Sequence, residues 1–371
     1  MSAPRAFYRP ELDILRFFAF LGVYIIHIAP YPVEVLEQHR VPHAIAEMAM
    51  AMVHGGVYGV DLFFVLSAYL ITELLLREKE SRGHLNVPAF YLRRALRIWP
   101  LYYVAVLIAA YVPLFNPSHD FSGFYLAAFL LFIGNWSFVW FGWINTVAAP
   151  LWSVSIEEQF YIFWPPLVAR MSRRGIAYAA VIMIAIANGS RLLGAAMNEG
   201  KEHLWANTFA HLDSIAAGIL VALLLGGKAV PLRASQRILL IIFCVGCFSV
   251  RGYYHVTPGN DRLSMSGTLI GYPAVVAGCV AMLVAFIGMP FRCAPLQYLG
   301  KISYGLYVYH VGCLLITDEL VTTNPGVMHT LIRTFAALAL TVMVSAASYA
   351  VVERPFLMLK RRFTVVESRP V

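Results

Sequence analysis

Charge is what this sequence has least of. Only 13% of its 371 residues are charged, against 60% that are hydrophobic, and the mean hydropathy is +0.70. A soluble fold cannot bury so much apolar surface. Uncharged runs of about 20 residues, the length of a membrane-crossing helix, recur along the chain. The composition therefore excludes a soluble protein and predicts a polytopic membrane protein.

Long polar stretches are also missing. The two longest, 77–97 and 353–371, leave no room for a soluble domain, so 1–371 is expected to form a single integral-membrane domain. The first apolar segment contains Asp13 and Arg16 and lacks a small-x-small cleavage site, so no cleavable signal peptide is expected.

Cysteine is scarce as well, with five in the chain, mostly in or beside apolar runs. Cys244 and Cys247 have CxxC spacing, but no strand–helix context of a redox motif surrounds them. We predict buried thiols, and neither a metal site nor a disulfide framework. The net charge of +8 comes from short basic clusters between apolar segments. This is the positive-inside pattern of membrane proteins, so no nucleic-acid partner is expected.

What the sequence does contain is a series of apolar segments. In lipid each must be helical, because only a helix satisfies its own backbone polar groups. They run at about 12–30, 56–76, 98–115, 124–141, 155–169, 175–197, 208–226, 236–250, 268–289, 302–317 and 330–352. The expected fold class is all-α, a transmembrane helix bundle.

Loop charges give the orientation. The basic run 360–362 places the C-terminus in the cytoplasm, and the basic loop 77–97 should be cytoplasmic too. The two assignments conflict if all three apolar segments between residues 98 and 169 cross. The region 124–154 is the candidate for a re-entrant segment. This leaves about ten crossings, with both termini cytoplasmic.

The first segment carries Arg16 near one end and His27 near the other. Eleven residues make about three helical turns, so both lie on one face, about 16 Å apart along the axis. Alternatively, Arg16 reaches the headgroups and His27 is an ordinary interfacial histidine. Ionisable groups inside a membrane are costly, so the pair on one stripe favours a functional role.

Two further motifs contain charged residues. In "GVDLFFVLSAYLI", Asp61 begins a span that also holds Ser67, and Arg16 or another arginine could be its partner. A structural ion pair explains Asp61 equally well. In "YLRRALRIWPLYY", Arg93 and Arg97 share a helical face, and guanidinium groups suit phosphates. The alternative is that these arginines are ordinary positive-inside anchors.

Three later motifs place polar groups in apolar surroundings. "PLWSVSIEEQFYIFWPPL" contains adjacent Glu157 and Glu158, and Ser155 to Glu158 fits a capping box. Adjacent glutamates point to different faces, so one must point inward and requires a role. "HLDSIAAG" buries Asp213 at the head of a span. "ISYGLYVYH" sets Tyr304, Tyr307 and His310 on one side of a helix, where simple interhelical hydrogen bonding is the alternative.

These motifs occur together in the order and spacing of a known family. "LDILRFFAFLGVYIIH", "GVDLFFVLSAYLI", "RRALRIWPLYY", "LWSVSIEEQFYIFWPPL", "LGKISYGLYVYH" and "VVERPF" resemble the membrane-bound acyltransferase family 3, over about residues 9–358. The family moves acyl groups, usually acetyl, from cytoplasmic acyl-CoA to hydroxyls of saccharides, lipids or macrolides. Some members carry an esterase-like domain after the spans. This chain stops at Val371 and is expected to be the stand-alone form.

The resemblance implies roles for particular residues. His27 corresponds to the family's essential histidine, Arg16 to its partner, and Arg93 and Arg97 to the donor-binding arginines. Glu157 and Tyr161 fall in the serine–glutamate–tyrosine motif. The chain departs from the family at Ala68, Tyr309 and Val311-Gly312, which lie in the less diagnostic motifs.

We therefore predict an O-acyltransferase (EC 2.3.1 type) of the bacterial cytoplasmic (inner) membrane. Acetyl-CoA is the expected donor, and a hydroxyl of a saccharide, glycolipid or macrolide the expected acceptor. In this hypothesis His27 is the general base, Tyr307 stabilises the oxyanion, and Glu157 is a further catalytic group. The cationic residues expected to hold the CoA phosphates are Arg16, Arg93, Arg94 and Arg97. Further site candidates are Asp13, Asp61, Ser67, Ser155, Tyr161, Asp213 and His310.

Several alternatives remain open. An acyl-histidine intermediate would serve as well as direct transfer. A secondary transporter of a polar solute could use the same buried ionisable residues as substrate and proton sites, although neither an inverted repeat nor a matched pair of broken spans is evident. A structural membrane subunit would leave the ionisable groups within the spans unexplained.

Overall fold

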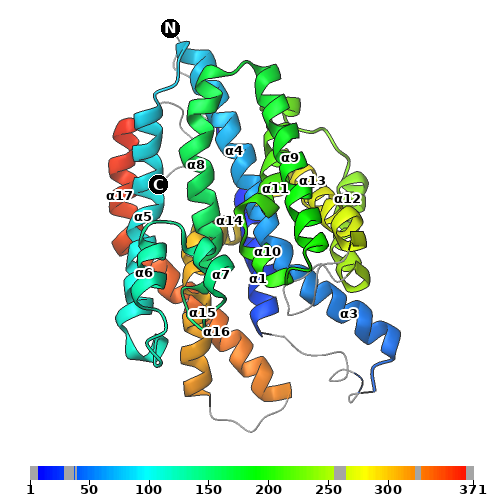
Figure 1. Cartoon of the computed structure of the whole chain (residues 1–371), viewed down its shortest axis with the longest axis vertical. Coiled ribbons are helices and arrows are strands. Elements are labelled where there is room, and N and C mark those ends of the chain that lie inside the picture. Colours follow the sequence, from blue (N-terminus) through cyan, green and yellow to red (C-terminus); the bar gives the residue numbers. More distant parts are fainter. Residues whose placement is uncertain (1–6, 29–36, 38–39, 255–264, 322–326, 365–371) are drawn as a thin grey trace. The chain divides into compact units, whose positions relative to one another are not determined.

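A computed structural model describes residues 7–28, 37, 40–254, 265–321 and 327–364. Most of the described residues are helical and none of them lies in a β-strand, which confirms the all-α class (Figure 1). Each of the eleven predicted apolar segments overlaps at least one helix, although several of them, 124–141 and 268–289 among them, also include turn or loop residues. Residues 29–30 of the first segment lie outside the described residues.

The chain divides into two compact units whose segments alternate along the sequence. Unit 1 comprises Met1–Tyr8, Glu78–Ala169 and Lys301–Val371, and unit 2 comprises Arg9–Arg77 and Arg170–Gly300. The helices of unit 2 are α1 (Pro10–Ile28), α3 (His43–Gly55), most of α4 (Gly59–Arg82), α9 (Arg173–Ala196), α10 (Lys201–Ala206), α11 (Leu212–Leu225), α12 (Ala234–Tyr254), α13 (Tyr272–Phe286) and most of α14 (Ala294–Lys301). Those of unit 1 are the end of α4, α5 (Val87–Tyr111), α6 (Gly123–Leu130), α7 (Gly134–Phe141), α8 (Trp152–Arg170), α15 (Ser303–Leu320), α16 (Val327–Ser348) and α17 (Arg354–Lys360).

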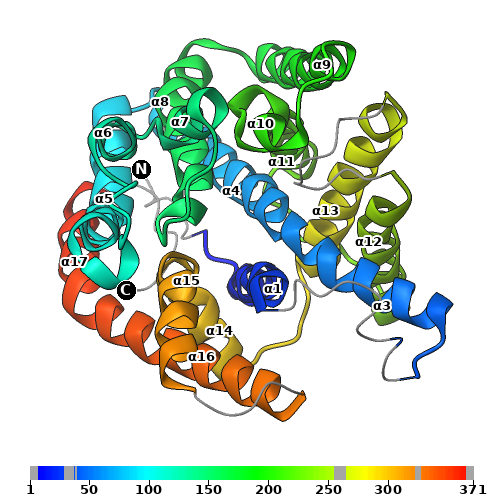
Figure 2. The same cartoon turned by 60° about the horizontal axis from the view of Figure 1, so that its bottom comes forward.

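Within each unit, long helices pack along one another. In unit 2, α12 lies beside α13, and α9 packs on α11 (Figure 2). In unit 1, α15 lies beside α16, and the short α17 packs on α5.

Five helices are long and apolar enough to cross a membrane, or six if α14 and α15 form one broken span, so the chain is a multi-pass membrane protein. With α14 and α15 counted as one span, the expectation of about ten crossings needs four helices more than these six. The candidates are α1, α5, α8 and α12. These crossings stay predictions. The cytoplasmic location of both termini also stays a prediction, because the ends of the chain lie outside the described residues.

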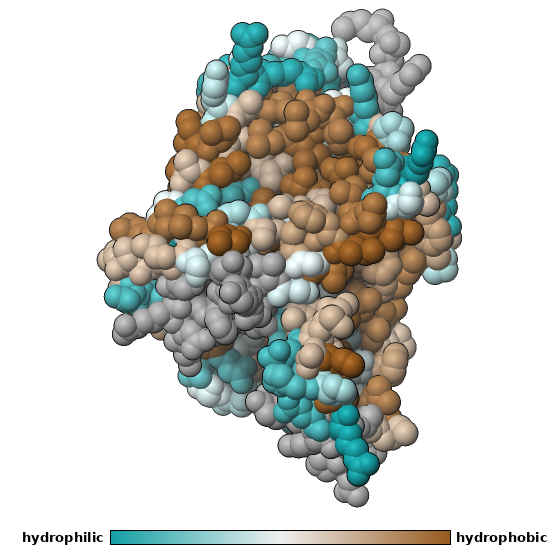
Figure 3. Space-filling model, turned by 90° about the vertical axis from the view of Figure 1, so that its right-hand side faces the viewer, coloured by the Kyte–Doolittle hydropathy of each residue, from teal (hydrophilic) through white to brown (hydrophobic). Residues whose placement is uncertain are grey.

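Exposed apolar side chains support this assignment. Figure 3 shows them spread over much of one face of the molecule. The exposed apolar residues on α9 and α12 of unit 2 include Tyr178, Val181, Ile182, Ile238, Leu239, Ile242 and Phe243. A surface of this kind is stable against lipid and unfavourable in water.

The candidate re-entrant region is broken in two. Helices α6 and α7 have eight residues each, and Phe132 between them has a positive φ of 56°. A helix of eight residues is about 12 Å long, well short of the roughly 30 Å hydrocarbon core. Neither helix can cross alone, as expected for a re-entrant segment.

Backbone contact fixes α1 against the start of α4. A Cβ atom on Gly56 would lie 2.3 Å from the carbonyl oxygen of Gly22, and one on Gly59 would lie 2.3 Å from that of Ala19. Small residues allow such close approach between helices in membranes. This contact holds in place the helix that carries Arg16 and His27.

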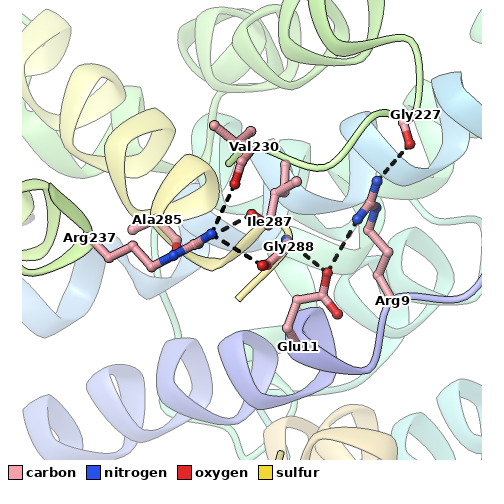
Figure 4. A network of polar contacts seen from close by, with 8 residues as sticks. All are labelled: Arg9, Glu11, Gly227, Val230, Arg237, Ala285, Ile287 and Gly288. Atoms are coloured by element: carbon pink, nitrogen blue, oxygen red, sulfur yellow. Dashed lines mark hydrogen bonds and ion pairs between the residues drawn. The ribbon is translucent and has the colours of Figure 1, made fainter. Parts of the chain in front are cut away.

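A buried arginine ties together the loops at one end of unit 2 (Figure 4). The Arg237 side chain is 6% exposed and donates to the carbonyls of Val230, Leu232, Ala285, Ile287 and Gly288, which include carbonyls at the C-terminal end of α13. Nearby, the Gly288 amide donates to Glu11 Oε1 (3.0 Å), which also accepts from Arg9. These contacts give Arg237 a structural role.

We predict that Arg237→Met destabilises the protein. Each buried carbonyl left without a donor costs about 1–3 kcal/mol, so the thermal unfolding midpoint should fall by several degrees. The matched control is Arg233→Met, which removes an exposed arginine four residues earlier. Equal midpoints for the two variants would contradict the proposed role.

Candidate functional site

Helix α1 carries three of the predicted site residues in unit 2. It is continuous from Pro10 to Ile28, so Arg16 and His27 do share one face. Arg16 Nη1 donates to Asp13 Oδ1 at 2.8 Å. Asp13 is buried and Arg16 is half-buried, so the guanidinium has a compensating charge on its own helix.

His27 is exposed near the end of α1. Its Nδ1 lies 2.7 Å from the carbonyl oxygen of Val23, which can only accept a hydrogen bond. The Nδ1 atom therefore carries a proton, and a neutral imidazole in this tautomer has its lone pair on Nε2. This is the form of histidine that can take a proton from a substrate.

The predicted donor-binding arginines lie in the first turns of α5, in unit 1. The helix begins after Asn86, whose side chain accepts from the Ala89 amide at 3.0 Å, and it runs unbroken through Pro100. Arg93 and Arg97 are four residues apart on this helix and therefore share a face, as predicted.

Each of these arginines interacts with a carboxylate from a different part of unit 1. Arg93 Nη2 donates to Glu78 Oε2 (2.8 Å), and its Nη1 donates to the Phe363 carbonyl (2.9 Å). The charge of Arg97 acts on Glu353, and the charge of Glu158 acts on Arg94.

Arg94 is also held by aromatic rings. Its guanidinium carbon lies 5.4 Å from the centroid of the Phe90 ring and 5.6 Å from that of the Tyr161 ring. The positive charges of Arg97 and Arg93 also act on Arg94.

The two adjacent glutamates of α8 have different partners. Tyr161 donates to Glu157 Oε2 at 2.8 Å, and the Trp99 indole donates to Glu158 Oε2 at 3.0 Å. Glu158 is the buried one, and its Oε1 has no hydrogen-bond partner among the described residues. The inward-pointing carboxylate is therefore Glu158, whereas the sequence had suggested Glu157 as the catalytic one.

The predicted capping box is wrong. Helix α8 begins at Trp152, after a 3₁₀ turn at Ala149–Leu151, so Ser155 lies inside the helix rather than at its cap. Its hydroxyl donates back to the Leu151 carbonyl (3.4 Å).

Tyr307 and His310 lie on α15 in unit 1. The Tyr307 hydroxyl is 2.8 Å from Ser153 Oγ and 3.0 Å from the Pro150 carbonyl. The His310 Nδ1 is 2.6 Å from the Tyr307 carbonyl. All of these side chains are buried. These contacts hold the start of α8 against α15, and the oxyanion-stabilising role of Tyr307 stays a prediction.

Asp61 pairs with a histidine rather than an arginine. Its Oδ1 accepts from Ser214 Oγ (2.8 Å) and lies 3.1 Å from His211 Nδ1. His211 Nε2 in turn lies 2.8 Å from the Trp205 carbonyl. Both ring nitrogens of His211 thus have partners, so the Asp61–His211 pair has a structural role: it links α4 to the start of α11 within unit 2. Ser67, further along α4, is half-buried.

Asp213 forms a buried ion pair with Arg191. Both side chains lie in the core of unit 2, and the guanidinium stacks over the Tyr272 ring with 4.3 Å between its carbon and the ring centroid. The sequence singled out Asp213 but not its partner, because Arg191 lies on another helix, α9, 22 residues earlier in the chain.

Sequence reasoning also missed a second source of positive charge near the α5 arginines. Lys360 and Arg361 follow the last apolar segment and were used only to assign topology. The packing of α17 on α5 brings them to this cluster. The "VVERPF" motif was a usable signal, since it contains Glu353 and leads into α17. No group of three or more metal-ligating side chains occurs in the part of the chain that the structure describes.

Comparison with known proteins gives the family. A family model described as "Acyltransferase domain" matches residues 9–350, so the chain belongs to this family of acyltransferases. The resemblance to acyltransferase family 3 is thereby confirmed.

The individual relatives share only a minority of their residues with this chain. "Putative peptidoglycan O-acetyltransferase YrhL" of Bacillus subtilis is 27% identical over 94% of this chain and 55% of its own length. "Peptidoglycan O-acetyltransferase OatA" of Listeria monocytogenes is 25% identical over 94% of this chain and 56% of its own length. The chain thus spans little more than half the length of these relatives. No solved structure matches it significantly.

We predict that Asp213→Ala is strongly destabilising, because it leaves the buried Arg191 charge without its counter-ion. Breaking such a pair costs about 3–5 kcal/mol, whereas replacing both partners in Arg191→Met/Asp213→Leu should recover much of the loss. The comparison is Asp318→Ala, which breaks the more exposed pair with Arg333 and should cost less than about 1 kcal/mol. An Asp213→Ala protein of normal thermal stability would argue against a structural role for this pair.

Proposed function

We propose that this protein is a membrane O-acyltransferase that moves an acetyl group from acetyl-CoA to a hydroxyl of a cell-surface saccharide, with His27 as general base. The observation that carries the proposal is the Nδ1 contact with Val23, which fixes the tautomer of an exposed imidazole. Membership of an acyltransferase family supports the reaction class.

Besides the acyl donor and the acceptor, the reaction needs only one base. Nε2 of His27 takes the proton of the acceptor hydroxyl as the oxygen attacks the thioester carbon. The tetrahedral intermediate then collapses with cleavage of the carbon–sulfur bond. The proton on His27 passes to the leaving thiolate, which gives an ester and free CoA and restores the neutral imidazole.

The donor half of the proposal rests on the α5 cluster. CoA is a thioester carrier with several phosphate charges, and guanidinium groups bind phosphate through paired hydrogen bonds. Among the described residues, the Arg94 and Arg97 side chains donate no hydrogen bond to the protein, which favours their use by a ligand. A donor-binding role for Arg16, which Asp13 holds within α1, stays a prediction.

The acceptor is proposed from the relatives. Two of them are named as peptidoglycan O-acetyltransferases, so a glycan hydroxyl of the cell surface is the first acceptor to test. The location in a bacterial cytoplasmic membrane is part of the same proposal.

We predict that His27→Ala abolishes transfer without affecting folding. Loss of a general base should lower the rate about 10²–10⁴-fold. Mass spectrometry of O-acetyl groups on surface glycans from producing cells gives the readout, and the thermal midpoint of the purified variant checks the fold. His203→Ala, which removes an exposed histidine of α10, is the control. Wild-type glycan acetylation in His27→Ala would end this proposal.

We predict that Arg97→Gln weakens donor binding and leaves the chemical step intact. The KM for acetyl-CoA should rise about 10-fold or more, the value of a charge-assisted hydrogen bond, with kcat little changed. Arg174→Gln at the exposed start of α9 removes the same charge elsewhere and should leave KM unchanged. Detergent-purified protein suffices for the assay. A fall in kcat at constant KM would place Arg97 outside the donor site.

A further inference from the structure

The helical run that contains α16 is polar on its buried face and apolar on its exposed face. Figure 2 shows α16 continuing into α17, and α16 packs on α15 within unit 1. The exposed face carries apolar side chains such as Met343 and Val351. The polar side chains that are less than a tenth exposed are Thr341, Ser345, Ser348, Tyr349 and Glu353. Such an arrangement suits a helix with lipid on one side and polar contacts on the other.

Two of these five side chains have hydrogen-bond partners. The Thr341 hydroxyl donates to the Ala337 carbonyl of its own helix at 2.7 Å, a common arrangement for threonine in helices. The Ser348 hydroxyl lies 3.1 Å from the hydroxyl of Tyr309 on α15.

The other three each have a buried atom without a hydrogen-bond partner among the described residues. These atoms are Ser345 Oγ, Tyr349 Oη and Glu353 Oε1. The three residues follow one another at intervals of four, so they share one face of the helix. Nearly all buried polar atoms in proteins are bonded to the chain or to ordered water, because an unpaired one is unfavourable. Three in one row therefore indicate a bound polar molecule.

The helix is widened where this row lies. Residues Tyr349–Glu353 form a π-helical turn, in which the Arg354 amide donates to the Tyr349 carbonyl five residues earlier. Such turns are rare and are often found at functional sites, so the local geometry also points to a site here.

Opposite the row, α15 presents a glycine. A Cβ atom on Gly305 would lie 3.2 Å from Ser345 Cβ and 3.5 Å from Glu353 Oε1. Ser345 and Glu353 thus approach the same point of α15, where no side chain of that helix separates them. The Lys301 ammonium lies 5.2 Å from the centroid of the Tyr349 ring, which adds a polar group beside the row.

We propose that Ser345, Tyr349 and Glu353 bind ordered water between α15 and α16, beside Gly305. Water can donate to the Glu353 oxygen and can both donate to and accept from the two hydroxyls, so it matches all three groups. A buried water makes about three hydrogen bonds, which this set supplies. A lipid chain in the same place would leave all three atoms unsatisfied. The bound water solvates Glu353 inside the bundle, a role separate from the proposed acyl transfer.

X-ray footprinting detects such water directly. The full chain in phosphatidylcholine nanodiscs is irradiated briefly in water enriched in oxygen-18, and labelled residues are identified by mass spectrometry. The radicals form from water, so a buried tyrosine is labelled when water lies beside it. Tyr349 should take up several-fold more oxygen-18 than Tyr102, a buried tyrosine whose hydroxyl donates to the Phe129 carbonyl. Equal labelling of the two tyrosines overturns the proposal.

A variant that displaces the water gives a second readout of the same experiment. Ser345→Val replaces the hydroxyl by methyl groups and should lower the labelling of Tyr349 several-fold. Thr341→Val, one turn earlier, is the matched control and should leave this labelling unchanged, because its hydroxyl already has a partner in its own helix. Unchanged labelling in folded Ser345→Val also contradicts the proposal.

Thermal stability distinguishes a hydrated site from a dry one. If water binds the Ser345 hydroxyl, Ser345→Ala removes a hydrogen bond and should lower the unfolding midpoint by a few degrees. If the site is dry, the variant removes an unsatisfied buried hydroxyl and the midpoint should rise. A raised or unchanged midpoint therefore overturns the proposal. So does a lowered midpoint without oxygen-18 at Tyr349, which would indicate a partner other than water.

Discussion

The structure depends on one electrostatic constraint: in a protein that is mostly apolar, a charged side chain away from water must have a partner. Asp13 with Arg16, Asp61 with His211 and Asp213 with Arg191 satisfy it inside unit 2. Arg237 satisfies it differently, with backbone carbonyls in place of a carboxylate. Separating such partners is costly. The contacts of Asp61, Asp213 and Arg237 join different elements of unit 2, whereas Asp13 and Arg16 lie on one helix.

Residues whose charge is not neutralised by a partner are the candidates for binding a ligand or transferring a proton. Glu158 has a buried oxygen with no partner among the described residues, and the positive charges of Arg93, Arg94 and Arg97 act on Lys360. Both are in unit 1, beside the arginines of α5. His27 is different again: it is exposed, and its bond to the Val23 carbonyl leaves the imidazole in one defined tautomer. Compensated charges explain the fold, and these exceptions indicate where a ligand or a proton acts.

Helical content and the stripe on α1 could be predicted from the sequence because both follow from local periodicity. Each of the eleven apolar segments overlaps a helix, and the spacing of Arg16 and His27 needs only an unbroken helix. Contacts distant in sequence could not be predicted. His211 is 150 residues from Asp61, and Phe363 is 270 residues from Arg93. The prediction of a capping box at Ser155 was wrong for a local reason. Helix α8 follows the turn at Ala149–Leu151 and therefore begins before Ser155.

The glycine contact between α1 and α4 has a consequence for how the chain can vary. At Gly22 and Gly56, main-chain atoms rather than side chains set the distance between α1 and the turn that leads into α4. Exposed apolar residues of α1, such as Phe18 and Ile25, can therefore be replaced by other apolar residues without moving the imidazole of His27. A single methyl group at either glycine would shift the imidazole. Substitutions along α1 should therefore be tolerated widely where the helix meets lipid, and hardly at all where the two backbones touch.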